Sequence, residues 1–183
     1  MLGQNFPQVL AAAREGADWA WARLYRDLAP SVLGYLRARG GVEPDDLTGE
    51  VFLQVVRDLR RFDGGEREFR AWVFTIAHHR LIDDSRQRAR RPVEPAAEVQ
   101  DREAPTEGAH EEVMRAFATA RVRRIIEQFA PEQRDVLLLR VLGGLTVSEV
   151  AKVVGKSSGA VKALQRRGLA QLRRALSEER VPL

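Results

Sequence analysis

The chain has 183 residues, enough for one domain or two small ones, and because it contains no cysteine it can form neither a disulfide framework nor a thiolate metal site. It shows no signal-peptide pattern and no apolar stretch long enough to span a bilayer, so we expect a cytoplasmic protein without membrane insertion. The formal net charge of +4 is unevenly distributed, since residues 1–91 carry a net +2, residues 92–114 a net −6 and residues 121–183 a net +7, which indicates a polyanionic partner for the C-terminal part.

Helical periodicity dominates the chain outside its middle, and strand signals are nearly absent, so we predict an all-α protein. Four helices are expected in the N-terminal half, over residues 7–15, 18–39, 44–61 and from residue 69 onward. Their apolar faces are formed by Trp21, Leu24, Tyr25, Leu28 and Val32 in the second helix, by Leu47, Val51, Phe52, Val55, Val56 and Leu59 in the third, and by Phe69, Trp72, Val73, Ile76, Ala77 and Leu81 in the fourth. The far end of the fourth helix is basic.

The segment 92–109 carries three prolines, no aromatic residue and mostly acidic charge. It cannot bury enough apolar surface to offset the entropy lost on ordering, which predicts a flexible acidic linker. Helical patterns resume from residue 111, with Val113, Phe117, Val122, Ile125 and Ile126, and again over residues 131–142. We therefore predict two small helical domains, residues 1–91 and 113–183, joined by a linker over residues 92–112.

Residues 145–176 predict a helix-turn-helix, in which a short helix, a glycine turn at Gly155 and a longer basic helix follow one another. Ser157 or Ser158 can cap the second helix, and Gly168 allows it to pack closely on a neighbour. Its apolar side carries Val161, Leu164, Leu172 and Ala175, and the opposite side carries Ser158, Lys162, Arg166 and Arg173. This division suits a DNA major groove, although a helical hairpin with a solvated basic face has the same periodicity.

Three segments in this order resemble one family. They are DDLTGEVFLQVVRDL at 45–59, EFRAWVFTIAHHRLIDDSRQRARR at 68–91 and PEQRDVLLLRVLGGLTVSEVAKVVGKSSGAVKALQRRGLAQLRRAL at 131–176. They resemble the polymerase-clamp-binding helix, the promoter-melting helix and the upstream-promoter domain of the extracytoplasmic-function (ECF) class of bacterial RNA polymerase sigma factors. Gly49, His79 and the run from Leu164 to Arg167 depart from the usual family pattern, so the promoter sequence does not follow from the resemblance.

The resemblance implies a transcription initiation factor that binds core RNA polymerase through its β′ clamp and β flap, recognises promoter DNA and is controlled by an anti-sigma protein. The resemblance assigns polymerase binding to Asp46, Leu47, Glu50, Phe52 and Gln54. Leu47, like Val51 and Val55, is rather expected in the core, and the alternative for Asp46 and Glu50 is a solvated position. Recognition and melting of the minus-ten element fall to Phe62, Asp63, Gly64, Gly65, Arg67, Arg70, Arg80, Arg86 and Arg90. The residues expected to recognise the minus-thirty-five element are Lys156, Ser157, Ser158, Ala160, Lys162, Ala163, Arg166 and Arg167.

Two other classes of function are compatible with parts of the sequence. A stand-alone helix-turn-helix regulator would bind duplex DNA unaided. An enzyme would need a site, and His79 with Asp83 at i, i+4 could share a metal, with His78 and Asp84 nearby. Metal sites need three or four ligands, and no nucleophile, base and orienting group form a recognisable set. We therefore predict no catalytic residue, no metal and no cofactor.

Overall fold

The structure is a computed structural model that describes residues 2–90 and 124–178. All of its regular elements are helical, as the periodicity predicts. They are η1 (Gly3–Asn5), α1 (Phe6–Arg14), α2 (Asp18–Ala38), α3 (Pro44–Asp58), η2 (Leu59–Arg61), α4 (Glu66–Ala89), α6 (Pro131–Val141), α7 (Val147–Val153) and α8 (Ser158–Glu178). None of these described helices is both long and apolar enough to cross a membrane. The predicted linker 92–112 and most of the helix predicted from residue 111 lie outside the described residues, and residues 124–127 at the end of that helix are helical.

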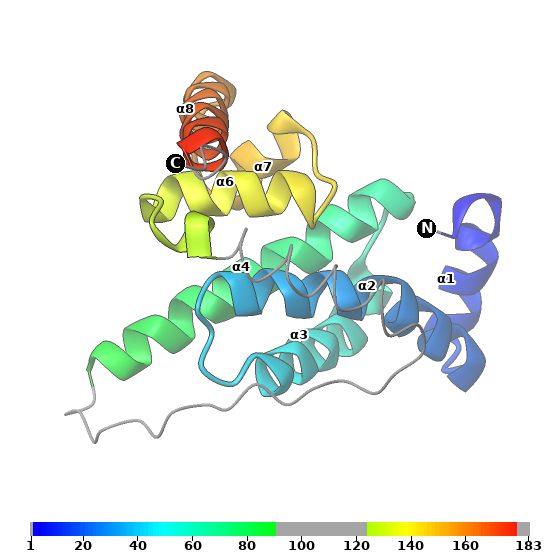
Figure 1. The fold of residues 1–183 in the computed structure, drawn as a ribbon. Helices are drawn as coiled ribbons and strands as arrows, with labels where there is room; N and C mark the ends of the chain where they lie inside the picture. The colour runs from blue at the N-terminus through cyan, green and yellow to red at the C-terminus, as the bar shows by residue number, and fades with distance from the viewer. Residues whose placement is uncertain (1, 91–123, 179–183) are drawn as a thin grey trace, which may run out of the picture.

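Helices α1 to α4 form the N-terminal half of the molecule (Figure 1). The predicted apolar stripes pack against one another, and Leu24, Val51 and Val73 are buried at their centre. Two predicted members of these stripes are exposed, Tyr25 by 47% and Val56 by 49%, and Trp21, Trp72 and Ile76 are half-buried. The buried faces of α2 and α3 are therefore narrower than the apolar pattern indicates, and an apolar strip is left at the surface.

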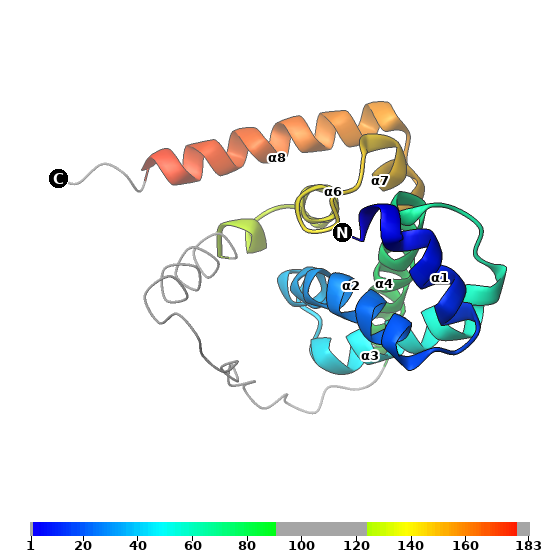
Figure 2. The ribbon, with the colours of Figure 1, turned by 90° about the vertical axis from the view of Figure 1, so that its right-hand side faces the viewer.

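Helices α6, α7 and α8 form the C-terminal half, in which α8 crosses over α6, seen end-on in Figure 2, and contacts it. Gly168 makes this packing possible, since a Cβ there would come within 2.7 Å of the Leu137 Cδ1 atom. Thr146 and Glu149 form a capping box at the start of α7, with the Glu149 amide donating to the Thr146 Oγ atom at 3.3 Å. Gly155 takes a φ of +64° after α7, and the Ser157 Oγ atom accepts the Ala160 amide at 3.2 Å, which places the cap of α8 at Ser157. The predicted helix-turn-helix is confirmed.

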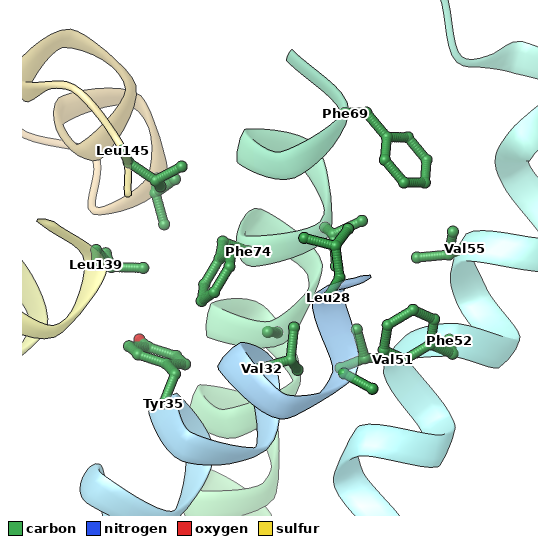
Figure 3. Packing of buried hydrophobic residues seen from close by; sticks show 14 of the residues in the cluster. Leu28, Val32, Tyr35, Val51, Phe52, Val55, Phe69, Phe74, Leu139 and Leu145 are labelled. Atoms are coloured by element: carbon green, nitrogen blue, oxygen red, sulfur yellow. The ribbon is translucent and has the colours of Figure 1, made fainter. Parts of the chain in front are cut away.

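The two halves share one hydrophobic core. Leu139 of α6 and Leu145, which follows it, belong to the same buried cluster as Tyr35 and Phe74 of the N-terminal half. Figure 3 shows Leu139 and Leu145 approaching Phe74 and Tyr35 from the side opposite Val55. Helix α4 contacts α7, and α2 contacts α6. The sequence gives no indication of this contact, because it joins segments about 100 residues apart.

A group of polar side chains is buried at the same contact. This interdomain cluster consists of Tyr35, Arg39, His78 and Asp135. The Tyr35 hydroxyl lies 2.8 Å from the His78 Nδ1 atom and donates to the Asp135 Oδ1 atom at 3.3 Å. The Arg39 guanidinium donates to both carboxylate oxygens of Asp135, with its Nη2 atom 3.2 Å from Oδ2. The chain of donors is complete when neutral His78 carries its proton on Nδ1.

Burial has opposite effects on the pKa values of two members of the cluster. It lowers the pKa of His78, against an opposing effect of Asp135 and with a further lowering by His79 and Arg39. It raises the pKa of the Tyr35 hydroxyl well above its ordinary value, and Asp135 adds to this rise. Both shifts have the same cause, since each group is held in its neutral form away from water.

The His78 pKa predicts that acid separates the two halves. The lowered pKa means that the packed arrangement binds a proton on His78 less tightly than a separated one, so its stability is full above the ordinary pKa of 6.5 and falls as the pH drops below it. We expect the radius of gyration from small-angle X-ray scattering to increase between pH 7.5 and pH 5.5. The variant His79→Gln should keep this response because His79 is exposed, and His78→Asn should lose it. A wild-type radius that is constant over this range would contradict the assignment.

Candidate nucleic-acid interface

Helix α8 carries exposed cations along its length, three on its first three turns and two more at Arg173 and Arg174. Lys162, Arg166 and Arg167 are exposed, and Val161 and Leu164 on the other side of the helix are buried. The first helix of the motif, α7, and the helix α6 cover the apolar side. The predicted division of α8 into a packed face and a basic face is confirmed, and the basic face is open to a ligand.

The other residues predicted for this site surround the start of α8. Ser157 and Ser158 are exposed, and Ala160 and Ala163 are half-buried. Lys156 is also half-buried, and its Nζ atom lies 2.7 Å from the Glu132 Oε1 atom of α6. The structure thus brings all eight residues together around one helix end, where five are exposed.

The segment between η2 and α4, residues 62–65, is called here the glycine loop. Phe62 is half-buried and stacks on Trp72 with ring centroids 5.1 Å apart, so its ring is part of an aromatic cluster of the protein. Asp63, Gly64 and Gly65 are exposed. Gly64 has a φ of +155°, and a Cβ there would lie 2.9 Å from the Glu68 Cβ atom. The exposed part of the loop is therefore mainly backbone, held in a shape that requires glycine.

The cations predicted on α4 do not share one environment. The side chain of Arg70 is 13% exposed, and it reaches the Asp27 carboxylate and the Gly143 carbonyl, each at 3.5 Å. Arg80 donates to the Gln54 side chain at 2.9 Å and lies 3.7 Å from Glu50, both on α3. Arg86 and Arg90, toward the end of α4, are exposed. The Arg86 Nη1 atom lies 3.9 Å from the Asp83 Oδ1 atom, one turn away on the same helix.

Arg67 lies directly after the glycine loop and contacts the C-terminal half. Its Nε atom is 3.1 Å from the Glu149 Oε1 atom. Partial burial opposes ionisation of Glu149, but hydrogen bonds from the amide and hydroxyl of Thr146, together with the Arg67 charge, outweigh it and lower the pKa of that carboxyl. Glu149 therefore stays ionised, and it links the helix-turn-helix to the loop.

The residues predicted to bind polymerase lie on α3 in two settings. Asp46 and Glu50 are exposed, and Leu47 is only 6% exposed, so Leu47 is a core residue. Gln54 is half-buried and donates to Asp58. Phe52 is buried, and its ring packs against that of Tyr25, with ring centroids 4.7 Å apart.

An apolar groove lies beside these residues, between α2 and α3. Its lining residues are Trp21, Ala22, Tyr25, Gly49, Phe52, Leu53 and Val56. Leu53 is 57% exposed and was not among the residues predicted for this site. The spacing of Leu53 and Val56, one turn apart and off the core stripe of α3, is the signal that sequence reasoning missed.

Within residues 2–90 and 124–178, no three or more His, Cys, Asp or Glu side chains gather in a way that could hold a metal ion. His78 is buried and its Nδ1 atom lies 2.8 Å from the Tyr35 hydroxyl, whereas His79 and Asp83 are exposed.

The comparisons with known proteins agree on one family. The sequence matches the family model for sigma-70 region 2 over residues 24–91 and that for sigma-70 region 4 over residues 119–172. It is 31% identical over 179 residues to the ECF RNA polymerase sigma factor SigD of Mycobacterium tuberculosis, a match that covers 94% of this chain and 84% of SigD. It is 33% identical over 177 residues to the ECF RNA polymerase sigma factor ShbA of Streptomyces griseus, covering 91% of this chain and 92% of ShbA.

Two solved structures have the same fold. CnrH, in complex with the cytosolic domain of CnrY, matches with a TM-score of 0.66 at 24% identity, over 93% of this chain and 96% of CnrH. The sigma factor RpoE of Bartonella quintana, in complex with the anti-sigma factor NepR, matches with a TM-score of 0.64 at 16% identity, over 87% of this chain and 98% of RpoE. With both region matches in order along one chain and relatives above 30% identity over nearly its whole length, the chain belongs to the ECF RNA polymerase sigma factors.

Proposed function

We propose that this protein binds core RNA polymerase, recognises the minus-ten and minus-thirty-five elements of a promoter, and initiates transcription there. The observation that carries the proposal is the presence, in one chain, of an exposed apolar groove on α2 and α3 and an exposed cationic face on α8. The groove fits a protein partner, and the cationic face fits duplex DNA. The protein acts as a recognition factor in the cytoplasm and supplies no catalytic group of its own.

The apolar groove and the acidic residues beside it form the proposed polymerase surface. Leu53 and Val56 offer exposed apolar area, and Asp46 and Glu50 on the same helix supply negative charge at its edge. An apolar centre with a charged rim is the usual composition of a protein interface. The family resemblance assigns this surface to the β′ clamp, and it assigns contacts of the C-terminal domain to the β flap.

The glycine loop and the end of α4 form the proposed minus-ten surface. Taking a base out of the stack costs a few kcal/mol and needs a site that holds the extruded base. The exposed backbone of Asp63, Gly64 and Gly65 can approach a base closely, and Arg86 and Arg90 can follow the backbone of the separated strand. The remaining predicted cations, Arg67, Arg70 and Arg80, face other parts of the protein, so this role requires that they be released.

The first turns of α8 form the proposed minus-thirty-five surface. Lys162 and Arg166 project from the exposed face toward a groove, and Arg167 lies beside them for a phosphate. Ser157, Ser158, Ala160 and Ala163 complete the set with small side chains that allow close approach.

The arrangement described must open on a promoter. The two elements are centred roughly 25 base pairs apart, or about 85 Å of duplex at 3.4 Å per base pair. Domains that pack α7 against α4 cannot reach both at once. The 21 residues of the predicted linker, 92–112, can extend to about 70 Å, so the two domains can stay joined while they separate along the duplex. We infer that core polymerase holds the two domains apart, and that an anti-sigma protein opposes this separation.

Transcription with purified core polymerase tests the proposed function. Run-off reactions on genomic fragments should give discrete transcripts only when the chain is present. A gel shift on a promoter recovered in this way should require core polymerase, because the chain alone holds its two domains together. Strong and specific binding by the chain alone would instead identify a stand-alone regulator.

A charge placed in the apolar groove should weaken polymerase binding. We expect Leu53→Glu to raise the dissociation constant for core polymerase at least about tenfold, since an ionised side chain would have to be buried at the interface. The matched control is Val42→Glu, which adds the same charge at a 43% exposed valine outside the groove. Equal effects of the two variants, measured by fluorescence titration, would show that the groove is not the binding surface.

The salt dependence of holoenzyme binding to a minus-thirty-five duplex tests the basic face of α8. If about five phosphates are neutralised, log affinity should fall with log salt at a slope near −4.5. Arg167→Ala should reduce the magnitude of the slope by about one, and Arg166→Ala should relax base preference as well. Arg26→Ala, which removes an exposed charge from α2, should leave the slope unchanged. A slope that does not respond to Arg167→Ala would remove that residue from the interface.

A further inference from the structure

The N-terminal segment, residues 2–14, contacts the glycine loop at both of its ends. At the first residue of the loop, the Arg14 Nη2 atom donates to the carbonyl oxygen of Phe62. After the loop, the carboxylate of Glu66, the first residue of α4, accepts the amide of Leu2 and, at 2.9 Å, the amide of Gly3. The matched sigma-70 region 2 begins at residue 24, so η1 and α1 lie outside it.

An aromatic cluster supports the same contact. The Phe6 ring of α1 lies 5.5 Å from that of Phe69 in α4, and the Phe69 ring lies 5.3 Å from that of Phe62. Phe62 in turn stacks on Trp72 at 5.1 Å. The first residue of the glycine loop is thus fixed by a ring stack below it and by the Arg14 guanidinium at its carbonyl.

Arg14 is placed there at a cost. Its Nε atom is buried and has no hydrogen-bond acceptor within the described part of the chain. A buried donor without an acceptor lowers the stability of the fold. The placement of Arg14 is therefore better explained by its contact with the loop backbone than by a gain in stability. What it holds is the backbone of a loop with two glycines, which without such contacts would sample many conformations.

We propose that residues 2–14, acting through Arg14 and Glu66, position the glycine loop for reading the minus-ten element, so that this segment sets how well the chain discriminates and opens that element. The proposal rests on the proposed function of the loop. Arg14 and Glu66 are positioning residues, because they act through the backbone at positions 62 and 66 and do not touch the base. A preorganised loop binds an extruded base without first losing its own conformational freedom.

The test uses the full chain with core polymerase on a promoter recovered by run-off transcription. Strand opening is followed by permanganate reactivity of unpaired thymines, on that promoter and on variants with single-base changes in the minus-ten element. Arg14→Gln should slow opening about tenfold, as expected for loss of one charge-assisted hydrogen bond. Glu66→Gln should slow it less, since the amide oxygen still accepts. Both should bring the rates on cognate and changed elements closer together.

Three comparisons separate positioning from a general structural role. Arg14→Lys keeps a donor and should restore part of the discrimination. Arg23→Gln removes the same charge from an exposed position on α2 and should behave as wild type. Affinity for core polymerase and for a minus-thirty-five duplex should be unchanged in every variant.

The outcomes are distinct. Unchanged opening and unchanged base discrimination in Arg14→Gln and Glu66→Gln would overturn the proposal, and so would a loss of opening that is accompanied by an equal loss of core binding. If the wild-type chain itself opens no promoter with core polymerase, the proposed function is wrong. The wild-type reaction therefore distinguishes a failure of the proposed function from a failure of the positioning proposal.

Discussion

Helix α4 packs against two partners at once, and most of the structure follows from how its residues divide between them. Phe69, Val73 and Ala77 recur every four residues and are buried in the N-terminal half. Arg67, Arg70, Phe74 and His78 recur every three or four residues on another side, and each of them contacts the C-terminal half or packs near it, at Glu149, at the Gly143 carbonyl, beside Leu139 and Leu145, and at the interdomain cluster. One side of α4 therefore belongs to the core of the N-terminal half, and another side forms the surface on which the C-terminal half packs.

This second contact is suited to being reversible. The apolar residues that it buries, such as Leu139 and Leu145, each contribute about 1.5–3 kcal/mol when fully removed from water. The ion pair between Arg39 and Asp135 adds little, because both groups lose hydration when it forms and regain it when the halves separate. A partner that binds only the separated form can open the contact when its binding free energy exceeds the free energy of this apolar contact. The buried polar groups then act mainly to fix one docking geometry.

Much of the fold could be predicted from local patterns, and much of the site could not. Glycines, prolines and apolar spacing predict the helices and their ends, and the helix-turn-helix is confirmed down to the turn at Gly155 and the cap at Ser157. Tyr25 and Val56 belong to predicted apolar faces but are exposed, because apolar spacing identifies a face without showing how much of it a neighbouring helix covers. The contacts of Arg67 and Arg70 were beyond sequence reasoning, since their partners are far along the chain and leave no periodic signal. A count of cations on α4 does not show which way each one faces.

The glycine loop lies between α1, which belongs to the same domain, and α7, which belongs to the domain that is proposed to move away. On one side it is held by α1, which shares the core of the N-terminal half through Phe6 and Phe69. On the other side Arg67, just beyond the loop, is held by Glu149 of α7. When the domains separate, Arg67 loses its partner and becomes available to a phosphate, but the contacts of Arg14 and Glu66 lie within the N-terminal half and persist. In the proposed opening, the charge beside the loop changes while the contacts that hold the loop backbone persist, so the surface proposed to read the minus-ten element keeps its shape.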